Sequence, residues 1–400
     1  MGVIMTDQRK ADAHIVHKPR FLSGHAMKIP TLRVLQQNGK VYKDADLPDI
    51  DETLALKIHD TFLFVRALDE RMLASQRQGR ISFYLTATGE EATDIGSAAA
   101  LEPGDVILPQ YREQGALAFR GFGVERFMNQ IFGNERDLGK GRQMPIHYGC
   151  AELNYHTVGS ALGTQIPQTT GVAHAMRAQG QPNCAICYFG EGAASEGDFH
   201  GGLNMASVLK VPALFFCRNN GYAISTPTHE QYAGDGIAAR GVGYGMQTIR
   251  VDGNDVLAVL LATQQARRLA VEEHEPILIE AMTYRLGAHS SSDDPSAYRS
   301  RKEEDVWRRK DPVARFRHWL EAQGWWDEER ENAARERHRN QVMAAMKAAE
   351  KVPAPPLHEL FSDVYASPPW HIREQEENLT AHIRRYPDEY KKTAWRLGDE

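Results

Sequence analysis

The sequence predicts an α/β protein in which helices cover both faces of a parallel sheet, with an N-terminal arm and a helical C-terminal extension. Between about residues 90 and 290, short apolar segments alternate with helical segments rich in Gly and Ala. The apolar segments are unbroken, as is typical of strands buried on both faces of a parallel sheet. We expect an arm at 1–48, an α/β core at 49–301 and the extension at 302–400.

The arm and the first helix come first along the chain. Prolines and glycines interrupt residues 1–48, so we expect an extended segment there. Asp49 and Glu52 then form a capping-box pattern, and apolar residues recur behind it at helical spacing. A long amphipathic helix is therefore predicted to follow this pattern and to end near Gly79.

The core alternates strands and helices. The predicted strands are 106–108, 185–189, 213–217, 247–251 and 277–281, and the predicted helices include 171–178, 199–209 and 256–270. In the helix 171–178, small residues would allow close packing, either in the core or at an interface. The polar segment 287–300 follows the last strand as a loop.

The C-terminal extension is predicted to be helical and strongly charged over 302–351. Its segment 328–351 alternates charge signs, as a solvated helix does. The apolar residues of a predicted docking stripe are Trp307, Phe316, Trp319 and Leu320. Those of the tail, Phe361, Val364, Tyr365 and Trp370, are expected to pack on the core or on a partner.

The composition excludes several classes of protein. Hydrophobic residues make up 42% and charged residues 25%, and the formal charge of −6 argues against a basic nucleic-acid-binding face. No apolar run approaches the roughly 18 residues of a membrane span. Because Asp7 and Asp12 lie in a start without an apolar segment, we expect neither a secretory signal nor a transit peptide. The expected location is the cytoplasm of a bacterium, or the mitochondrial matrix in a eukaryote.

The four cysteines are predicted to be reduced core thiols. Cys184 and Cys187 have C-x-x-C spacing, but no second pair completes a metal site. An odd spacing within a strand also sends the two side chains to opposite faces. Cys150 and Cys217 complete the set.

Polar residues follow two of the predicted strands. Gly190-Glu191-Gly192 follows 185–189, and Asn219-Asn220 follows 213–217. A right-handed βαβ unit brings both turns to the carboxyl edge of the sheet. Carboxylate and amide oxygens suit Mg²⁺, and the glycines, with a helix expected to begin near Ala193, suit a diphosphate. The stretch therefore predicts a Mg²⁺–diphosphate site.

Other interpretations of this stretch are weaker. A dinucleotide fingerprint would need Gly where Ser195 stands, and residues 133–141 lack the spacing of a Walker A loop. A Gly-rich turn without any ligand would account for Gly-Glu-Gly alone, but not for its combination with the Asn-Asn turn after the next strand.

The runs GEGAASEGD and FFCRNNGYAISTP resemble the α subunit of the E1 component of 2-oxoacid dehydrogenase complexes, and most of all its branched-chain branch. The resemblance extends from about Leu54 into the C-terminal tail. It implies a thiamine-diphosphate-binding fold and three Mg²⁺ ligands: Glu191, Asn220 and the carbonyl of Tyr222. Glu191 replaces the Asp of the general thiamine motif.

The resemblance also implies further cofactor contacts. They are Gln110, Tyr111, Arg112, Ser160, Leu162, Gly190, Gly192, Ala193 and Arg218. The residues themselves favour part of this set, because Gln110–Arg112 follow a strand and the charge of Arg218 at a strand end needs an anionic partner. Relatives also bind K⁺ near residue 160, but Gly159 and Ala161 depart from the residues expected there, which weakens the case for K⁺.

His289 is the candidate catalytic residue, because an imidazolium beside a diphosphate is favourable and the matching histidine contacts the phosphate end of the cofactor. Ser290 and Ser300 match positions that are phosphorylated in animal relatives. Phe83, Tyr111 and Leu162 are expected to line the branched aliphatic pocket, although core packing explains Phe83 nearly as well.

The implied reaction is thiamine-diphosphate-dependent decarboxylation of a branched-chain 2-oxoacid, followed by reductive acylation of the lipoyl group of E2. This is an acyl-transferring step of branched-chain amino acid catabolism. Glu90-Glu91 is interpreted as a charge pair at a helix start. The resemblance places the activating Glu and a catalytic His on a β subunit, within an α₂β₂ heterotetramer.

Three alternatives stay open at this point. A pyruvate dehydrogenase E1 α subunit would have the same fold and cofactor. A non-catalytic scaffold subunit would have no need of the Glu191/Asn220 pair. A nicotinamide oxidoreductase is disfavoured by Ser195.

Overall fold

The computed structural model describes residues 16–390. The expectations that rest on Asp7 and Asp12, and the first part of the predicted arm, lie outside the described residues.

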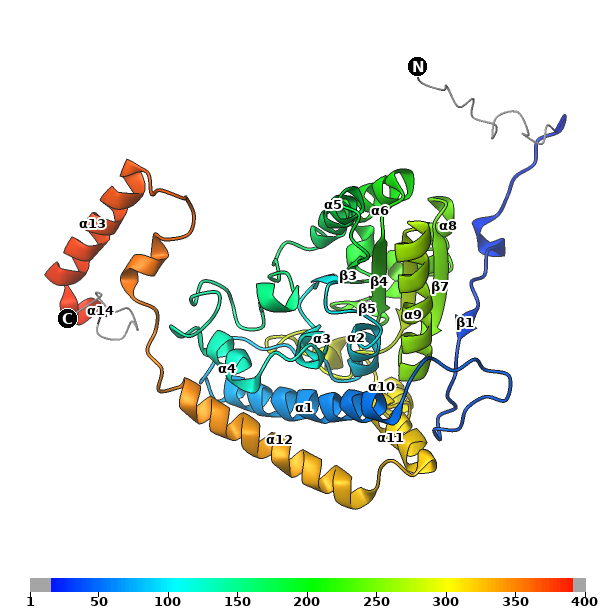
Figure 1. Ribbon diagram of the computed structural model, residues 1–400, viewed down its shortest axis with the longest axis horizontal. Helices are drawn as coiled ribbons and strands as arrows, with labels where there is room; N and C mark the ends of the chain where they lie inside the picture. Colours follow the sequence, from blue (N-terminus) through cyan, green and yellow to red (C-terminus); the bar gives the residue numbers. More distant parts are fainter. Residues whose placement is uncertain (1–15, 391–400) are drawn as a thin grey trace.

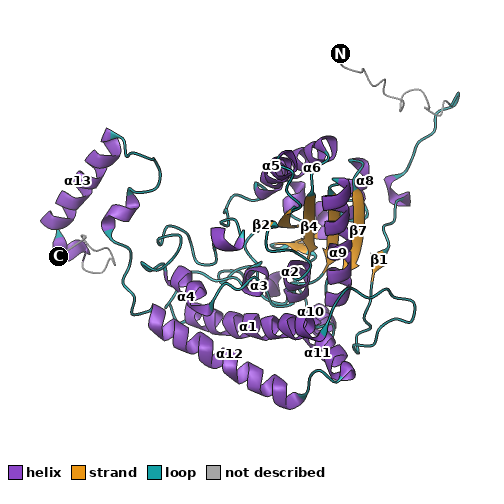
Figure 2. Cartoon of the chain, viewed as in Figure 1, coloured by secondary structure: helices purple, strands orange, loops and turns teal. Residues whose placement is uncertain are grey.

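A parallel sheet of six strands forms the centre of the molecule, in the order β1-β7-β8-β4-β3-β2 (Figure 2). The strands are β1 (Thr31–Leu32), β2 (Val106–Leu108), β3 (Ala185–Gly190), β4 (Ala213–Asn219), β7 (Gln247–Asp252) and β8 (Ile277–Met282). The five predicted strands are confirmed. The sequence did not predict β1, in which a short piece of the arm pairs with β7 at the sheet edge.

Helices cover both faces of this sheet, which confirms the predicted fold class (Figure 1). On one face lie α5 (Gln165–Ala178), α6 (Gly197–Leu209) and α8 (Ala238–Gly243), and on the other α2 (Glu91–Ala98), α3 (Gln114–Phe119) and α9 (Val256–Glu273). Strand side chains alternate between the two layers, because successive residues of a strand point to opposite faces. Cys184 therefore packs in one layer and Cys187 in the other, and all four cysteines are buried free thiols, as predicted.

Two helix starts differ from their predictions. Asp51, and not Asp49, caps α1 (Glu52–Arg77), since its carboxylate accepts a hydrogen bond of 2.8 Å from the Leu54 amide. The backbone of Asp49 is bonded instead to the side chain of Gln264. α5 begins before the predicted 171, because Pro167 falls in the first turn, where a missing N–H costs no helical hydrogen bond.

The C-terminal extension wraps the first helix. It contains α10 (Arg301–Arg308), α11 (Pro312–Gln323) and α12 (Glu328–Ala349), and α12 runs along α1 and α4 (Val124–Phe132) (Figure 1). The interpretation of 328–351 as merely solvated is wrong, because a buried stripe runs down the helix beneath its charges, at Ala334, Val342, Ala345 and Met346. Of the predicted docking stripe, Phe316, Trp319 and Leu320 are buried, and Trp307 stacks on Tyr284.

The tail leaves the body of the molecule. α13 (Trp370–Arg385) and α14 (Pro387–Tyr390) stand apart from the sheet and its helices (Figure 1). Val364, Tyr365 and Trp370 are 69%, 52% and 71% exposed, so these apolar residues do not pack on the core of this chain. Among the described helices, none has the length and apolar character needed to cross a membrane.

The remaining elements are short. β5 (Tyr222–Ala223) and β6 (Thr226–Pro227) form an antiparallel hairpin directly after the Asn-Asn turn, and α7 (Thr228–Gln231) follows them. Turns of 3₁₀ helix lie at Gly24–Ala26, Ala151–Leu153, Ala193–Ser195, Pro295–Ala297 and Leu357–Leu360.

Candidate functional site

The two polar turns meet at the carboxyl edge of the sheet. β3 and β4 are neighbouring parallel strands, and Gly190 lies in register with Arg218. The next residues leave the sheet together, so that a carboxylate oxygen of Glu191 accepts a hydrogen bond of 3.3 Å from the Asn220 amide. A cavity of about 410 Å³ opens at this point, between the ends of β2, β3, β4 and β8.

Most of the predicted site residues line this cavity. They are Gln110, Tyr111, Arg112, Leu162, Gly190, Glu191, Gly192, Ala193, Arg218, Asn220, Tyr222 and His289. Ser160 is not among the lining residues, and its hydroxyl is 2.8 Å from the Nε2 atom of His147. Phe83 does not line the cavity either and packs against the hydrophobic core around α1, which is the alternative that the sequence left open.

Only the second asparagine of the pair faces the cavity. The side-chain amide of Asn219 donates to Glu280 and to the Tyr232 hydroxyl, at 2.8 and 3.0 Å, on the far side of the strand end. Successive residues at a strand end point in opposite directions, so Asn219 anchors the turn and Asn220 serves the site.

The turn after β2 is held by one buried carboxylate. An Oε atom of Glu113 accepts hydrogen bonds of 3.0 Å from the backbone amides of Gln110, Tyr111 and Arg112. The side chain of Gln110 in turn accepts from the Gly190 amide at 2.7 Å. The ends of β2 and β3 are thereby fixed to each other beside the cavity.

Three buried arginines make the cavity suitable for an anion. Arg218 forms ion pairs of 3.0 and 2.7 Å with Glu90 and Glu113. Arg112 donates to the backbone carbonyls of Thr86 and His289. Arg285, which comes shortly after β8, donates toward the carbonyls of Tyr222 and Ile224.

Some buried polar atoms of the cavity have no hydrogen-bond partner among residues 16–390. They include the Oε1 atom of Glu191 and the Nε atoms of Arg218 and Arg285. A buried polar atom without a hydrogen bond is costly, so these atoms indicate a ligand. The carboxylate oxygen suits a cation and the guanidinium groups suit an anion, so the donor set fits Mg²⁺ together with a diphosphate.

The charge state of Glu191 supports a cation partner. Burial raises the pKa of Glu191 to about 7 against the lowering effect of its backbone hydrogen bonds, and the neighbouring Glu90 carboxylate adds a smaller upward contribution. A divalent cation beside Glu191 would offset both effects, because an adjacent positive charge favours the ionised carboxylate. Across residues 16–390, no cluster of three His, Cys, Asp or Glu side chains could hold a metal ion, so any metal here depends on amide and carbonyl oxygens.

His289 lies at the edge of this cluster, but its expected charge is wrong for the chain alone. Burial and the positive charges of Arg112 and Arg285 lower the pKa of His289 to about 4, so its imidazole is neutral near pH 7. Its ring is 3.4 Å from the Arg112 guanidinium, and its backbone amide donates to Asp293. The predicted imidazolium considered only the attraction of a bound diphosphate, and not the repulsion from Arg112 and Arg285.

A second correction concerns the helix expected to begin near Ala193. A 3₁₀ turn occupies Ala193–Ser195, and α6 begins only at Gly197. The glycine next to the carboxylate has a steric role instead, since a Cβ atom at Gly192 would lie 2.7 Å from that of Ala223. The close approach of the two turns therefore needs glycine at 192.

Sequence reasoning missed three charged residues of the site: Glu90, Glu113 and Arg285. Arg285 could have been found, since it follows a predicted strand as Arg218 does. Glu113 stands next to a predicted site residue. Glu90 gave no signal, because an acidic residue at a helix start is ordinary.

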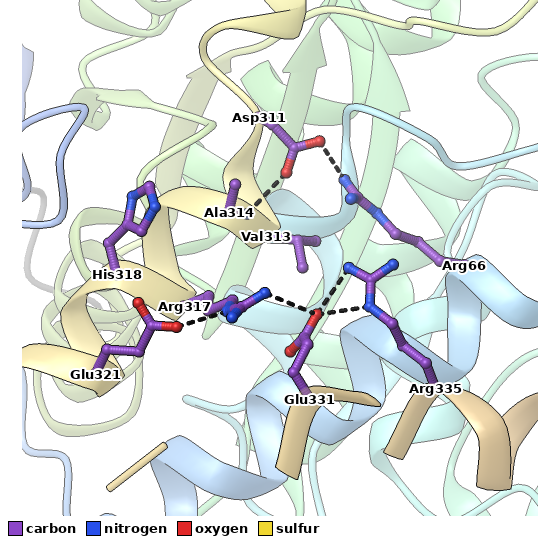
Figure 3. Close-up of a pocket in the computed structure, with 9 residues that line it drawn as sticks. All are labelled: Arg66, Asp311, Val313, Ala314, Arg317, His318, Glu321, Glu331 and Arg335. Carbon is purple, nitrogen blue, oxygen red and sulfur yellow. Dashed lines mark hydrogen bonds and ion pairs between the residues drawn. The ribbon is translucent and has the colours of Figure 1, made fainter. Parts of the chain in front are cut away.

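A second cavity of about 400 Å³ lies between α1, α11 and α12 (Figure 3). Its charged side chains pair with one another: Arg66 with Asp311, Arg317 with Glu321, and Arg335 with Glu331. The pairing leaves little net charge to attract a ligand, and the cavity is remote in sequence from the strand ends that carry the predicted site.

Ser290 and Ser300, the two serines that match phosphorylated positions of animal relatives, lie in the polar segment 287–300 that also contains His289. Ser300 caps α10, since its hydroxyl accepts a hydrogen bond of 3.2 Å from the Glu303 amide. The Ser290 hydroxyl lies 3.1 Å from that of Ser292 and is close in sequence to His289.

A parallel sheet with such a cavity at its carboxyl edge defines the class of α/β enzymes that bind diphosphate cofactors at strand ends. The family described as Dehydrogenase E1 component matches residues 59–358, and the chain belongs to this thiamine-diphosphate-dependent family as a 2-oxoacid dehydrogenase E1 α subunit. The family that the motifs suggested is thereby confirmed.

Curated relatives agree over nearly the whole chain. The sequence is 52% identical over 382 residues to the mitochondrial 2-oxoisovalerate dehydrogenase subunit alpha of Homo sapiens, covering 95% of this chain and 86% of the relative. Subunit alpha 1 of Arabidopsis thaliana is 50% identical over 364 residues, covering 91% and 77%. The Caenorhabditis elegans subunit is 51% identical over 364 residues, covering 90% and 84%.

Proposed function

We propose that this chain acts on branched-chain 2-oxoacids, decarboxylating them and passing the acyl group to the lipoyl group of an E2 partner. The observation that carries the proposal is the cavity in which Glu191 meets Asn220 among three buried arginines. The relatives named for 2-oxoisovalerate support the choice of substrate.

Glu191, Asn220 and the carbonyl of Tyr222 are the proposed Mg²⁺ ligands. Arg112, Arg218 and Arg285 are positioned to neutralise the phosphates, and the Gly190 and Gly192 backbone lets them approach. Space supports this role for Gly190, since a Cβ atom there would meet nothing closer than 3.9 Å and would occupy the cavity itself. We assign no K⁺ ion, because Gly159 and Ala161 differ from the expected residues.

When bound, thiamine diphosphate supplies the nucleophilic carbon and accepts the electron pair that decarboxylation releases. The chain's own residues bind and orient. Tyr111 and Leu162 give the cavity an apolar wall for a branched side chain, and Leu162 is 41% exposed. His289, neutral beside Arg112, can donate or accept a hydrogen bond at the phosphate end without adding to the positive charge.

A β subunit is needed to complete the site, in an α₂β₂ assembly. We assign the activating Glu to the β chain, as the resemblance to the family implies, and not to Glu196, which lines the cavity but is exposed. Two surfaces support a partner. Gly171 and Ala175 present a small-residue face on α5, while Ala173 between them is in the core. The exposed tail residues supply the second surface.

We place the protein in the cytoplasm if its source is bacterial and in the mitochondrial matrix if it is eukaryotic. The names of the relatives include mitochondrial, which supports the second case. Cell fractionation with an antibody to the chain tests this.

The substrate is tested by kcat/KM for 2-oxoisovalerate and pyruvate, using the chain assembled with its β subunit, Mg²⁺ and thiamine diphosphate. We expect at least about tenfold preference for 2-oxoisovalerate, since each methylene in an apolar pocket is worth about 1–3 kcal/mol. A preference for pyruvate would identify a pyruvate dehydrogenase subunit instead. Failure of the assembled wild-type protein to bind the cofactor in a calorimetric titration would favour a scaffold subunit.

A further inference from the structure

Glu90 is a buried carboxylate that the proposed chemistry does not use. It directly precedes α2, is 2% exposed, and turns toward the cluster of arginines. One of its oxygens lies 3.0 Å from Arg218 and 3.1 Å from the side-chain nitrogen of Asn220, and the other is 4.0 Å from Arg112. It does not line the cavity. Glu90 therefore contacts Asn220, a proposed metal ligand, and Arg218 and Arg112, two proposed phosphate ligands, without itself lining the cavity.

The contact with Asn220 decides which way that amide points. A primary amide has a donating nitrogen and an accepting oxygen, and a carboxylate can only accept. Because Glu90 accepts from Nδ2, the Oδ1 atom of Asn220 turns away from Glu90 and toward the Tyr222 amide, 3.2 Å away. Oδ1 thus accepts from the backbone of Tyr222, the residue whose carbonyl is the third proposed metal ligand.

The contact with Arg218 decides the local charge. Arg218 is paired with Glu90 through one terminal nitrogen and with Glu113 through the other, while its Nε atom has no hydrogen-bond partner in the described part of the chain. Without Glu90, the positive charge of Arg218 would keep only one of its two carboxylate partners, Glu113. A cation would then be repelled more strongly and an anion attracted more strongly.

We propose that Glu90 is a positioning residue that sets the metal affinity of the site, by fixing the carbonyl end of the Asn220 amide and by neutralising Arg218. The inference rests on the proposed Mg²⁺–diphosphate function. It predicts that loss of the Glu90 charge moves the affinities for Mg²⁺ and for a metal-free diphosphate in opposite directions, which a purely structural role would not do.

The test uses the full chain assembled with its β subunit and stripped of cofactor. Mg²⁺ is titrated calorimetrically at saturating thiamine diphosphate, and inorganic pyrophosphate is titrated in the presence of EDTA. For Glu90→Ala we expect Mg²⁺ binding to weaken by about tenfold or more, because second-layer partners of metal ligands typically change affinity by about 10–100-fold. Pyrophosphate affinity should rise, and a Mg²⁺ affinity that falls while pyrophosphate affinity does not rise would count against the neutralisation of Arg218. Glu90→Gln should lose less Mg²⁺ affinity, because its amide oxygen can still accept from Asn220.

Glu91→Gln is the matched control. Glu91 is equally buried and adjacent, but it contacts Arg66 and the Gly89 amide, away from the site. Arg66 belongs to the separate cavity of Figure 3. We expect a smaller change, with the same sign for both ligands. If Glu90→Ala also lowers both affinities by one common factor, or changes neither, the proposal is wrong.

If the single Glu90 variants fold poorly, the orientation of the Asn220 amide can be tested independently by exchanging the donor at position 220 and the acceptor at position 90. Asn220→Asp places two carboxylates against each other and should weaken Mg²⁺ binding. Adding Glu90→Gln supplies a donor in place of the lost one, so the double variant should bind Mg²⁺ more tightly than Asn220→Asp alone. A double variant no tighter than the single one overturns the proposal. If the wild-type assembly binds neither Mg²⁺ nor thiamine diphosphate, the proposed function itself fails.

Discussion

At the scale of single residues, the site is defined by polar atoms that the fold buries and leaves unpaired. The Oε1 atom of Glu191 is buried and has no hydrogen-bond partner among the residues that the structure describes, although its other oxygen accepts from the Asn220 amide. An empty hydrogen-bonding position on a buried carboxylate is tolerable when a cation fills it. The affinity for a metal should thus depend on this one side chain.

Replacing Glu191 with Ala should lower the Mg²⁺ affinity of the assembled protein by roughly a hundredfold, at the upper end of what supporting residues contribute, because a ligand is lost outright. Mg²⁺-dependent titration of thiamine diphosphate measures the change. Glu196→Ala is the control, since Glu196 also lines the cavity but is exposed. Unchanged titration of the Glu191 variant would remove this residue from the set of metal ligands.

Gly190→Ala separates binding from folding. The new methyl group would lie in the cavity, with its nearest neighbour, Gln110, at 3.9 Å. We expect cofactor affinity to fall at least about tenfold while the melting temperature stays near that of the wild type, because the chain itself is not crowded. Parallel calorimetric and thermal-unfolding measurements check this. Equal cofactor affinity in the variant would mean that the diphosphate does not approach Gly190.

At the scale of elements, α12 is fastened to α1 by a buried carboxylate. Glu331 lies 2.8 Å from His59 on α1, and it also accepts from Trp326 and Arg335 at 2.9 and 2.7 Å. Burial raises the pKa of Glu331, but these partners outweigh burial and lower it to about 2. The charged helix is thus joined to the core by electrostatics as well as by its apolar stripe.

The Glu331 contacts predict a pH dependence of stability. A carboxyl whose pKa is lowered on folding stabilises the protein above its unfolded pKa, and the stabilisation is lost as the pH falls through the folded value. For Glu331 the loss spans the range from 4.5 down to about 2. Glu331→Gln should therefore lower the free energy of unfolding at neutral pH by about 3 kcal/mol.

Urea unfolding of the two proteins at neutral pH and at about pH 3 measures this effect. The difference between them should shrink at the acidic pH, where the wild-type carboxylate begins to lose its advantage. A difference that stays constant across this range would contradict the assigned ion pairs. Arg330→Gln, which changes an exposed residue of the same helix, is the control.

At the scale of the whole molecule, the chain leaves apolar surface uncovered in addition to the open cavity. The cavity opens at the sheet edge, and α13 stands apart from the body with Trp370 exposed (Figure 1). Large exposed apolar residues in a group indicate an interaction surface. The tail therefore fits a partner better than it fits this chain's own core.

The isolated chain should be inactive, and mixing with its β subunit, Mg²⁺ and thiamine diphosphate should restore decarboxylation. The physical reason is that the acid needed at the aminopyrimidine is assigned to the partner. Release of CO₂ from a 2-oxoacid, measured before and after mixing, checks this. Full turnover by the isolated chain would refute the divided site.

Much of the fold followed from local pattern. Unbroken apolar runs predicted five strands, because a strand buried on both faces needs no polar side. β1 was not predicted because a strand of two residues is too short to show a periodic pattern. Its residues are a strand only because they pair with the edge of β7. α12 was misjudged because its charges dominate the composition, while its apolar stripe has meaning only against α1.

By itself, the sequence determined the sheet, the family and the two turns that bring Glu191 and Asn220 together, because neighbouring parallel strands must end at one edge. Only the tertiary structure decided the charge balance of the site. Glu90, Glu113 and Arg285 come from separate segments and meet through packing. Burial and the charges of Arg112 and Arg285 keep His289 neutral, while Glu90 and Glu113 pair with Arg218. These electrostatic effects depend on distance and burial, which no local pattern contains.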